Sequence, residues 1–182
     1  PPVKLVASPD VPYLWSLTTG LKGRVFVGSG DLGALYRVSR GKTSVVYQTE
    51  SLGVYALSSM GKDVFFATAP EGQVFRFRKN KAKSIFVPRE KYVWDLVATK
   101  QGLFVATGDP GLIYRVPVGG GDAEEWFNSS DVHVKVLEKE SSGSFLVGTS
   151  GRGLLIRVKT KKQDPFVLFD APRKEISAIA TN

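Results

Sequence analysis

Histidine is the side chain best suited to general-base or metal-ligand chemistry, and this sequence contains one, His133. An imidazole titrates near neutral pH and binds transition metals through either ring nitrogen, so His133 is a candidate for both roles. Both roles need partners, and the chain has neither a second histidine nor a cysteine. The plainer alternative is a histidine hydrogen-bonded in a turn. The sequence therefore predicts no metal site, no cofactor and no complete catalytic set.

Aromatic and acidic residues recur at the points where short apolar segments begin. Aromatic rings with a few polar groups suit peptides, sugars or flat ligands, and packing between structural elements is the alternative. Corresponding positions carry different residues, whereas purely structural positions tend to repeat, and this favours ligand binding. The candidate binding residues, with His133, are Tyr13, Trp15, Tyr55, Tyr92, Trp94, Asp95 and Glu175.

These residues belong to a repeat with a period near 40 residues. Four glycines stand in register at steps of 39, 39 and 42 residues, and an arginine follows each glycine four positions later. The glycines are Gly33, Gly72, Gly111 and Gly153, and the arginines are Arg37, Arg76, Arg115 and Arg157. We interpret both sets as structural: the glycines close turns that need a positive φ or a close backbone approach, and the arginines lie along interfaces or pair with carboxylates.

Each repeat contains four short β-type runs, which in the first repeat are Leu14–Thr18, Arg24–Gly28, Ala34–Val38 and Ser44–Gln48. Turn-forming residues separate the runs, and no segment of useful length has a helical period. Four short strands in every 40 residues are typical of a β-propeller. The sequence therefore predicts an all-β chain of about four antiparallel four-stranded blades, with the candidate residues near the central mouth.

The expected blades cover about residues 12–50, 51–90, 91–130 and 131–172 within one propeller region, 1–182. Residues 3–8 resemble an outer strand and 176–181 an inner strand. These two strands do not complete a blade, so we expect an arc of a larger ring of six to eight blades, or a ring completed by oligomerisation. The Pro1-Pro2 start also raises the alternative of an excised or engineered fragment with no activity of its own.

Charge is distributed unevenly along the chain, which carries 25 Lys and Arg against 17 Asp and Glu, a net charge of +8. Acidic residues favour the turns on the mouth side, and basic residues gather at the turns between third and fourth strands. The basic turn residues are Arg40, Lys42, Lys79, Lys81, Lys83, Lys159, Lys161 and Lys162. These turns contain no aromatic residues for base stacking, which argues against nucleic-acid binding.

Three segments resemble the repeats of large bacterial propeller proteins whose blades are similar to WD-repeat or NHL blades but lack the WD signature. The segments are Ala106–Val116, Val46–Ser51 and Asp131–Leu137. Here Trp94-Asp95 falls in a first strand, not at the end of a third strand as in a WD-repeat blade. The resemblance implies a propeller fold, and it implies no activity.

The leading hypothesis is a non-catalytic scaffold that binds a protein or peptide partner, or further blades of the same or another chain, through an aromatic and acidic mouth. The alternative is a hydrolase or lyase that uses His133 and mouth carboxylates in the completed ring. No apolar stretch has the length of a membrane helix, so no membrane span is expected. The absence of cysteine and of a signal peptide leaves the compartment open, whether bacterial cytoplasm, periplasm or exterior.

Overall fold

Sixteen β-strands form four antiparallel blades in the computed structural model, which describes residues 5, 9–159 and 165–181. The first blade contains β1 (Leu14–Gly20), β2 (Arg24–Ser29), β3 (Ala34–Ser39) and β4 (Lys42–Gln48), with the 3-10 turn η1 (Leu21–Gly23) after β1. The second contains β5 (Gly53–Met60), β6 (Asp63–Ala69), β7 (Val74–Arg78) and β8 (Lys81–Phe86). The third contains β9 (Tyr92–Thr99), β10 (Gly102–Gly108), β11 (Leu112–Val116) and β12 (Glu124–Asn128). The fourth contains β13 (His133–Lys139), β14 (Phe145–Ser150), β15 (Leu154–Val158) and β16 (Phe166–Asp170).

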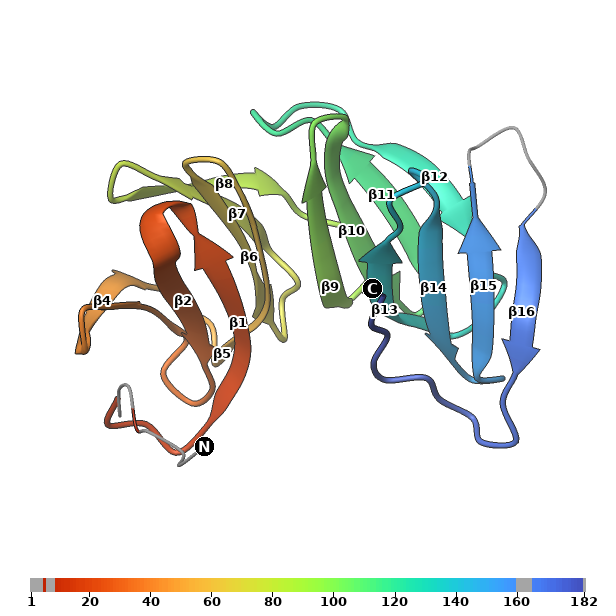
Figure 1. Cartoon of the computed structure of the whole chain (residues 1–182), viewed down its shortest axis with the longest axis horizontal. Helices are drawn as coiled ribbons and strands as arrows, with labels where there is room; N and C mark the ends of the chain where they lie inside the picture. The colour runs from red at the N-terminus through yellow and green to blue at the C-terminus, as the bar shows by residue number, and fades with distance from the viewer. Residues whose placement is uncertain (1–4, 6–8, 160–164, 182) are drawn as a thin grey trace.

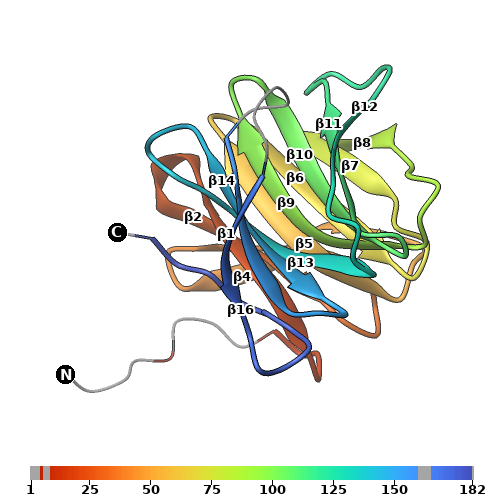
Figure 2. The ribbon, with the colours of Figure 1, turned by 90° about the vertical axis from the view of Figure 1, so that its right-hand side faces the viewer.

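The blades follow one another in an arc, with the first strand of each blade toward the middle and the fourth strand at the periphery (Figure 1). The inner strands β1, β5, β9 and β13 contact their neighbours along the arc, which Figure 2 views from the end that carries β16. One backbone pairing, Gly108 with His133, also joins β10 to β13 and links the third and fourth blades. The chain is therefore an all-β partial propeller.

The core consists of three apolar clusters, one between each pair of neighbouring blades. Successive residues of β6 show how one strand serves two clusters: Phe65 packs toward the third blade and Phe66 toward the first, and both are fully buried. Because side chains alternate across a pleated strand, a blade enclosed by two neighbours needs apolar residues on both faces. This explains the unbroken burial of β10 from Gly102 to Gly108.

The two ends of the arc lack such neighbours and expose apolar side chains. Leu17 on β1 is 69% exposed, and every residue of β16 is exposed, including Phe166 and Phe169. The expected outer strand at 3–8 falls almost wholly outside the described residues. Residues 176–181 form no strand, since the described residues contain no second strand with which they could pair. Just before this segment, Glu175 forms an isolated antiparallel β-bridge with Ser150 at the end of β14.

The turn between the second and third strands explains the repeated glycine. Gly33 has a φ of 53°, and a Cβ there would lie 2.0 Å from the carbonyl oxygen of Ser51 in the loop to the next blade. The Gly33 amide donates to Leu52 O at 3.0 Å, and its carbonyl accepts from the Thr49 amide at 3.1 Å. Gly111 lies in a comparable contact, with its amide 2.9 Å from Asp131 O. The glycine is thus the point where each blade joins the loop leading to the next.

A buried hydroxyl stands four residues before each repeated glycine, a regularity that the sequence analysis did not recognise. Thr107 is representative: its Oγ1 donates to Leu112 O at 3.2 Å and accepts from the Leu112 amide at 3.3 Å, which closes the turn. The set is fully buried and consists of Ser29, Thr68, Thr107 and Thr149. The signal in the sequence was a Ser or Thr at a constant distance from the glycine.

Among the described residues, no helix is long enough and apolar enough to cross a membrane.

Candidate functional site on the mouth face

The candidate residues lie where the inner strands begin, on the face formed by the loops between blades. Tyr13 precedes β1, Tyr92 begins β9 and His133 begins β13. Trp15, Tyr55 and Trp94 follow near the start of β1, β5 and β9. Because the inner strands of successive blades run in the same direction around the arc, their first residues gather at one end.

The first aromatic group joins the first two blades. Trp15 stacks on Tyr13 with ring centroids 5.7 Å apart, and on Tyr55 with centroids 5.2 Å apart and planes 13° from parallel. Tyr13 is 53% exposed and Trp15 is 51% exposed. About half of each of these two side chains is open to solvent, so the group presents an aromatic surface at the mouth.

The second aromatic group joins the third and fourth blades. Tyr92 stacks on Trp94 at 5.2 Å, and both rings meet His133 edge to face. Trp94 Nε1 donates to His133 Nδ1 at 3.3 Å. Lys135 Nζ lies over the Trp94 ring, 3.3 Å from its centroid, which is a cation–π contact. The indole nitrogen only donates, so Nδ1 of His133 is the unprotonated nitrogen, and in the neutral ring Nε2 carries the proton.

Glycines at equivalent positions make room for the two tryptophans. A Cβ on Gly30 would lie 2.1 Å from Trp15 Nε1, and a Cβ on Gly108 would lie 2.4 Å from Trp94 Nε1 and 2.0 Å from His133 Nδ1. Both glycines stand three residues before a repeated glycine. A tryptophan at the mouth position is thus matched by a glycine on the neighbouring second strand or the turn after it.

An apolar cavity of about 240 Å³ lies between the two aromatic groups. Tyr55 lines it from the first group, and Tyr92 and Trp94 line it from the second. Leu52 and Pro70, which the sequence analysis did not single out, complete the apolar wall together with Ala69 and Val93. The repeat placed Tyr55, Tyr92 and Trp94 at the mouth, but it gave no signal for Leu52 and Pro70, which lie outside the strands.

Asp95 occupies a position behind the rings. Its Oδ1 accepts from the Leu96 amide at 2.7 Å and its Oδ2 from the Leu137 amide at 2.8 Å, on the next blade. Burial raises the pKa of Asp95 to about 6 and nearby Glu138 adds to this, although the two backbone hydrogen bonds lower it. Because both carboxylate oxygens are engaged by backbone amides, the contacts of Asp95 favour a link between blades over contact with a ligand.

Glu175 and Lys135 supply charge at the fourth-blade end of the mouth. A hydrogen bond from Ser177 Oγ to Glu175 Oε1 at 2.8 Å lowers the pKa of this exposed carboxylate, and so does the positive charge of Lys135. Burial lowers the pKa of Lys135, and Glu175 opposes that shift. The mouth is therefore aromatic over the first three blades and charged beyond His133.

The four repeated arginines lie in the third strand of each blade, away from the mouth residues. Arg76 pairs with Asp63 at 2.8 Å, Arg115 with Glu124 at 2.7 Å, and Arg157 with both oxygens of Glu140 at 2.8 Å. Arg37 instead lines a cavity on the face opposite the mouth.

Among the described residues, no three His, Asp or Glu side chains lie close enough together to hold a metal ion. The mouth as described offers aromatic surface, one apolar cavity and flanking charge. This arrangement suits the binding of an apolar or aromatic side chain of a partner.

Comparison with known proteins places the fold among propellers. A chain of a nidogen–laminin complex superposes with a TM-score of 0.75 at 11% identity, with 85% of this chain and 64% of that chain covered. Virginiamycin B lyase from Staphylococcus aureus gives 0.75 at 16% identity, with 91% and 58% covered. YCF48 from Cyanidioschyzon merolae gives 0.72 at 14% identity, with 94% and 61% covered, and YCF48 bound to a D1 peptide gives 0.65 at 13% identity, with 85% and 56% covered.

These structures are propeller proteins, and this chain spans about three fifths of their length. Identities this low show a shared fold. No protein-family model matches the sequence, and no curated protein matches it significantly.

Proposed function

We propose that this chain is a non-catalytic binding scaffold that holds a protein or peptide partner on its mouth face. The observation that carries the proposal is the apolar cavity lined by Tyr55, Tyr92 and Trp94, flanked by the exposed stack of Tyr13 and Trp15. Large aromatic side chains in rigid, partly exposed positions supply much of the affinity at protein interfaces. A cavity of about 240 Å³ accommodates one anchoring side chain rather than a whole small molecule.

Two of the similar structures support a partner of this kind. One matched chain comes from a nidogen–laminin complex, and YCF48 has been solved with a D1 peptide bound. The charged end of the mouth, with Lys135 and Glu175, offers polar contacts that orient a bound peptide. In this proposal the anchoring side chain enters the cavity and the flanking chain runs over the Tyr13–Trp15 stack.

The alternative, a hydrolase or lyase centred on His133, has the lyase fold match in its favour. The local geometry opposes it, because Nδ1 accepts from Trp94 and neither ring nitrogen is then free to take a proton. A general base at this position would have to break the Trp94 contact first. Conversion of an ester or lactone panel by the native chain, abolished by His133→Ala, would establish the enzyme and overturn the scaffold proposal.

We also propose that further blades complete the ring at the two apolar ends of the arc. The ends expose Leu17 on one side and Phe166 and Phe169 on the other, and the chain spans about three fifths of the propellers it matches. Apolar surface of this kind is usually covered by a partner. Light scattering after size exclusion tests the source of the blades: a discrete oligomer assigns them to copies of this chain, and a monomer assigns them elsewhere.

Selection of peptides from a displayed library tests the binding proposal. Selected peptides should share an aromatic or aliphatic anchor, and Tyr55→Ala or Trp94→Ala should weaken their binding by about tenfold or more. Val87→Ala is the control, because Val87 is 59% exposed but lies just after the outer strand β8 and does not line the mouth cavity. Equal loss in the mouth and control variants, or no loss in the mouth variants, would refute a mouth-face site.

A further inference from the structure

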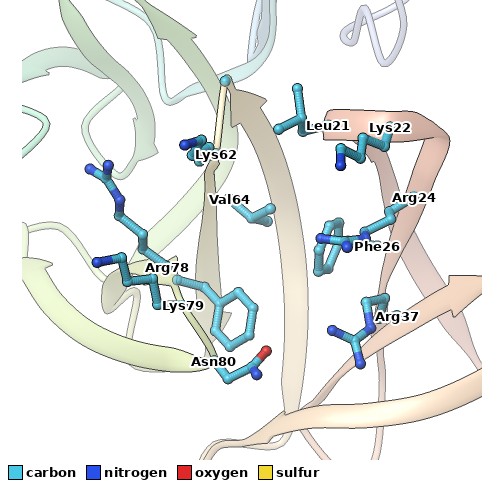
Figure 3. Close-up of a pocket in the computed structure, with 12 residues that line it drawn as sticks. Leu21, Lys22, Arg24, Phe26, Arg37, Lys62, Val64, Arg78, Lys79 and Asn80 are labelled. Carbon is cyan, nitrogen blue, oxygen red and sulfur yellow. The ribbon is translucent and has the colours of Figure 1, made fainter.

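A second cavity, of about 430 Å³, lies between the first and second blades on the face opposite the mouth. Six cationic side chains line it, three from each blade, and Figure 3 shows the two sets on opposite sides of the opening. They are Lys22, Arg24, Arg37, Lys62, Arg78 and Lys79. No aspartate or glutamate is among the lining residues.

The positive charge of this cavity is poorly compensated by the protein. Arg78 contacts Asp63, with Nε 3.6 Å from Oδ1, and the same carboxylate already pairs with Arg76 at 2.8 Å. No ion pair involving the other five cations occurs among the described residues. Like charges gathered around one opening repel one another, and a bound anion relieves that repulsion.

The floor of the cavity is apolar and buried. Phe26, Val64 and Phe77 form it, each at most 6% exposed, and the two phenylalanine rings meet at 6.1 Å. A low-dielectric wall beneath charges of one sign concentrates the field at the opening. The same burial makes the rings unavailable for stacking on nucleic-acid bases, so the site offers charge without a base platform.

We propose that this cavity binds a compact anion carrying two or more negative charges, either an oligophosphate or a polycarboxylate. Arginine guanidinium groups donate paired hydrogen bonds to both kinds of oxyanion, and lysines add mobile charge around them. The volume lies within the range of small-molecule sites. All the lining residues belong to the first two blades, so the site is complete within this chain and independent of the mouth.

Backbone conformation provides a way to remove charge here without disturbing the fold. Lys22 and Lys79 both have positive φ, 62° and 51°, in the turns that carry them. Asparagine adopts this left-handed conformation more readily than lysine. The double variant Lys22→Asn/Lys79→Asn therefore removes two charges from the cavity while the turns are kept or strengthened.

Titration calorimetry at low ionic strength, with sodium tripolyphosphate and with citrate as probes, tests the proposal. We expect saturable binding of at least one probe, weakened about tenfold by Lys22→Asn/Lys79→Asn and by added salt. Tripolyphosphate alone would assign the site to phosphates, citrate alone to carboxylates, and both to compact anions generally. Thermal unfolding of the variant checks that its fold is kept.

The matched control is Lys100→Gln/Lys139→Gln, which removes two exposed lysines near the first-to-second-strand turns of the third and fourth blades. It lowers the net charge by the same amount at a distance from the cavity, and probe affinity should change less than twofold. Equal weakening in both variants would show attraction to the overall positive charge and overturn the site. If neither tripolyphosphate nor citrate binds at low ionic strength, the proposed site is overturned as well.

Discussion

Trp94 and His133 come from neighbouring blades and meet through a 3.3 Å hydrogen bond from the indole nitrogen to Nδ1 of the imidazole. The contact exists because Gly108 has no side chain: a Cβ there would lie within 2.4 Å of both ring nitrogens. The same glycine makes the backbone pairing to His133 that joins the two blades. The aromatic mouth and the blade interface are thus built at the same point.

Replacing Gly108 by alanine should therefore damage both features. We expect Gly108→Ala to lower the free energy of unfolding by about 2 kcal/mol through overpacking, and to change the fluorescence of Trp94 as the rings separate. Gly119→Ala is the control, since no atom lies within 4 Å of a Cβ at that position. Unchanged stability and fluorescence in Gly108→Ala would contradict the assigned contact.

The buried hydroxyl of Thr107 should contribute measurably to stability. Thr107→Val keeps the shape of the side chain but leaves the Leu112 amide without its 3.3 Å acceptor, at an expected cost of about 1–3 kcal/mol in urea unfolding. Thr19→Val on β1 is the control, because the Thr19 side chain is exposed. If both variants lose the same stability, the hydroxyl does not close the turn as described.

The raised pKa of Asp95 predicts a specific dependence of stability on pH. Burial raises this pKa to about 6, so near pH 5 the folded chain keeps a proton that the unfolded chain has released. The folded state then binds more protons, and the contribution is complete below the ordinary pKa of 3.8 and is lost as the pH rises through 6. The free energy of unfolding should fall by up to about 3 kcal/mol across this interval.

The variant Asp95→Asn isolates this contribution from other titrating groups. The difference in unfolding free energy between the native chain and Asp95→Asn should shift in favour of the variant as the pH rises from 4 to 7. Denaturant unfolding at several pH values measures it. Parallel pH profiles for the two proteins would show that Asp95 is not titrating in a buried site.

Lys135 should stabilise the second aromatic group through its charge. Its Nζ lies 3.3 Å from the centre of the Trp94 ring, so Lys135→Met should cost about 0.5–1 kcal/mol while keeping an apolar stem of similar length. Lys139→Met, on the same strand but exposed, serves as the control. A loss of thermal stability confined to Lys135→Met supports the cation–π contact. Equal losses in both variants would show that the effect comes from the change in overall charge and not from this contact.

The sequence by itself determined the fold class. Strand and turn signals are local: alternation of side chains, glycines with positive φ such as Gly33, and a constant repeat length can be read without knowing how blades pack. Alignment of the four repeats also indicated that residues such as Trp15, Tyr55 and Trp94 occupy equivalent positions near one end of the arc. The turn hydroxyls were readable in the same way and were overlooked.

Tertiary structure decided what those positions do. Whether Asp95 reaches a ligand or the Leu137 amide depends on how closely two blades approach, and no local pattern specifies that distance. The cationic cavity combines Lys22 and Lys62, from turns between first and second strands, with Lys79. Of these three lysines, the sequence pointed to Lys79 alone, as one of the basic residues in turns between third and fourth strands. Of those turn residues, Lys161 and Lys162 lie outside the described part of the chain. Side chains far apart in sequence meet only through blade packing, because packing sets both the separation and the burial that give them their chemistry.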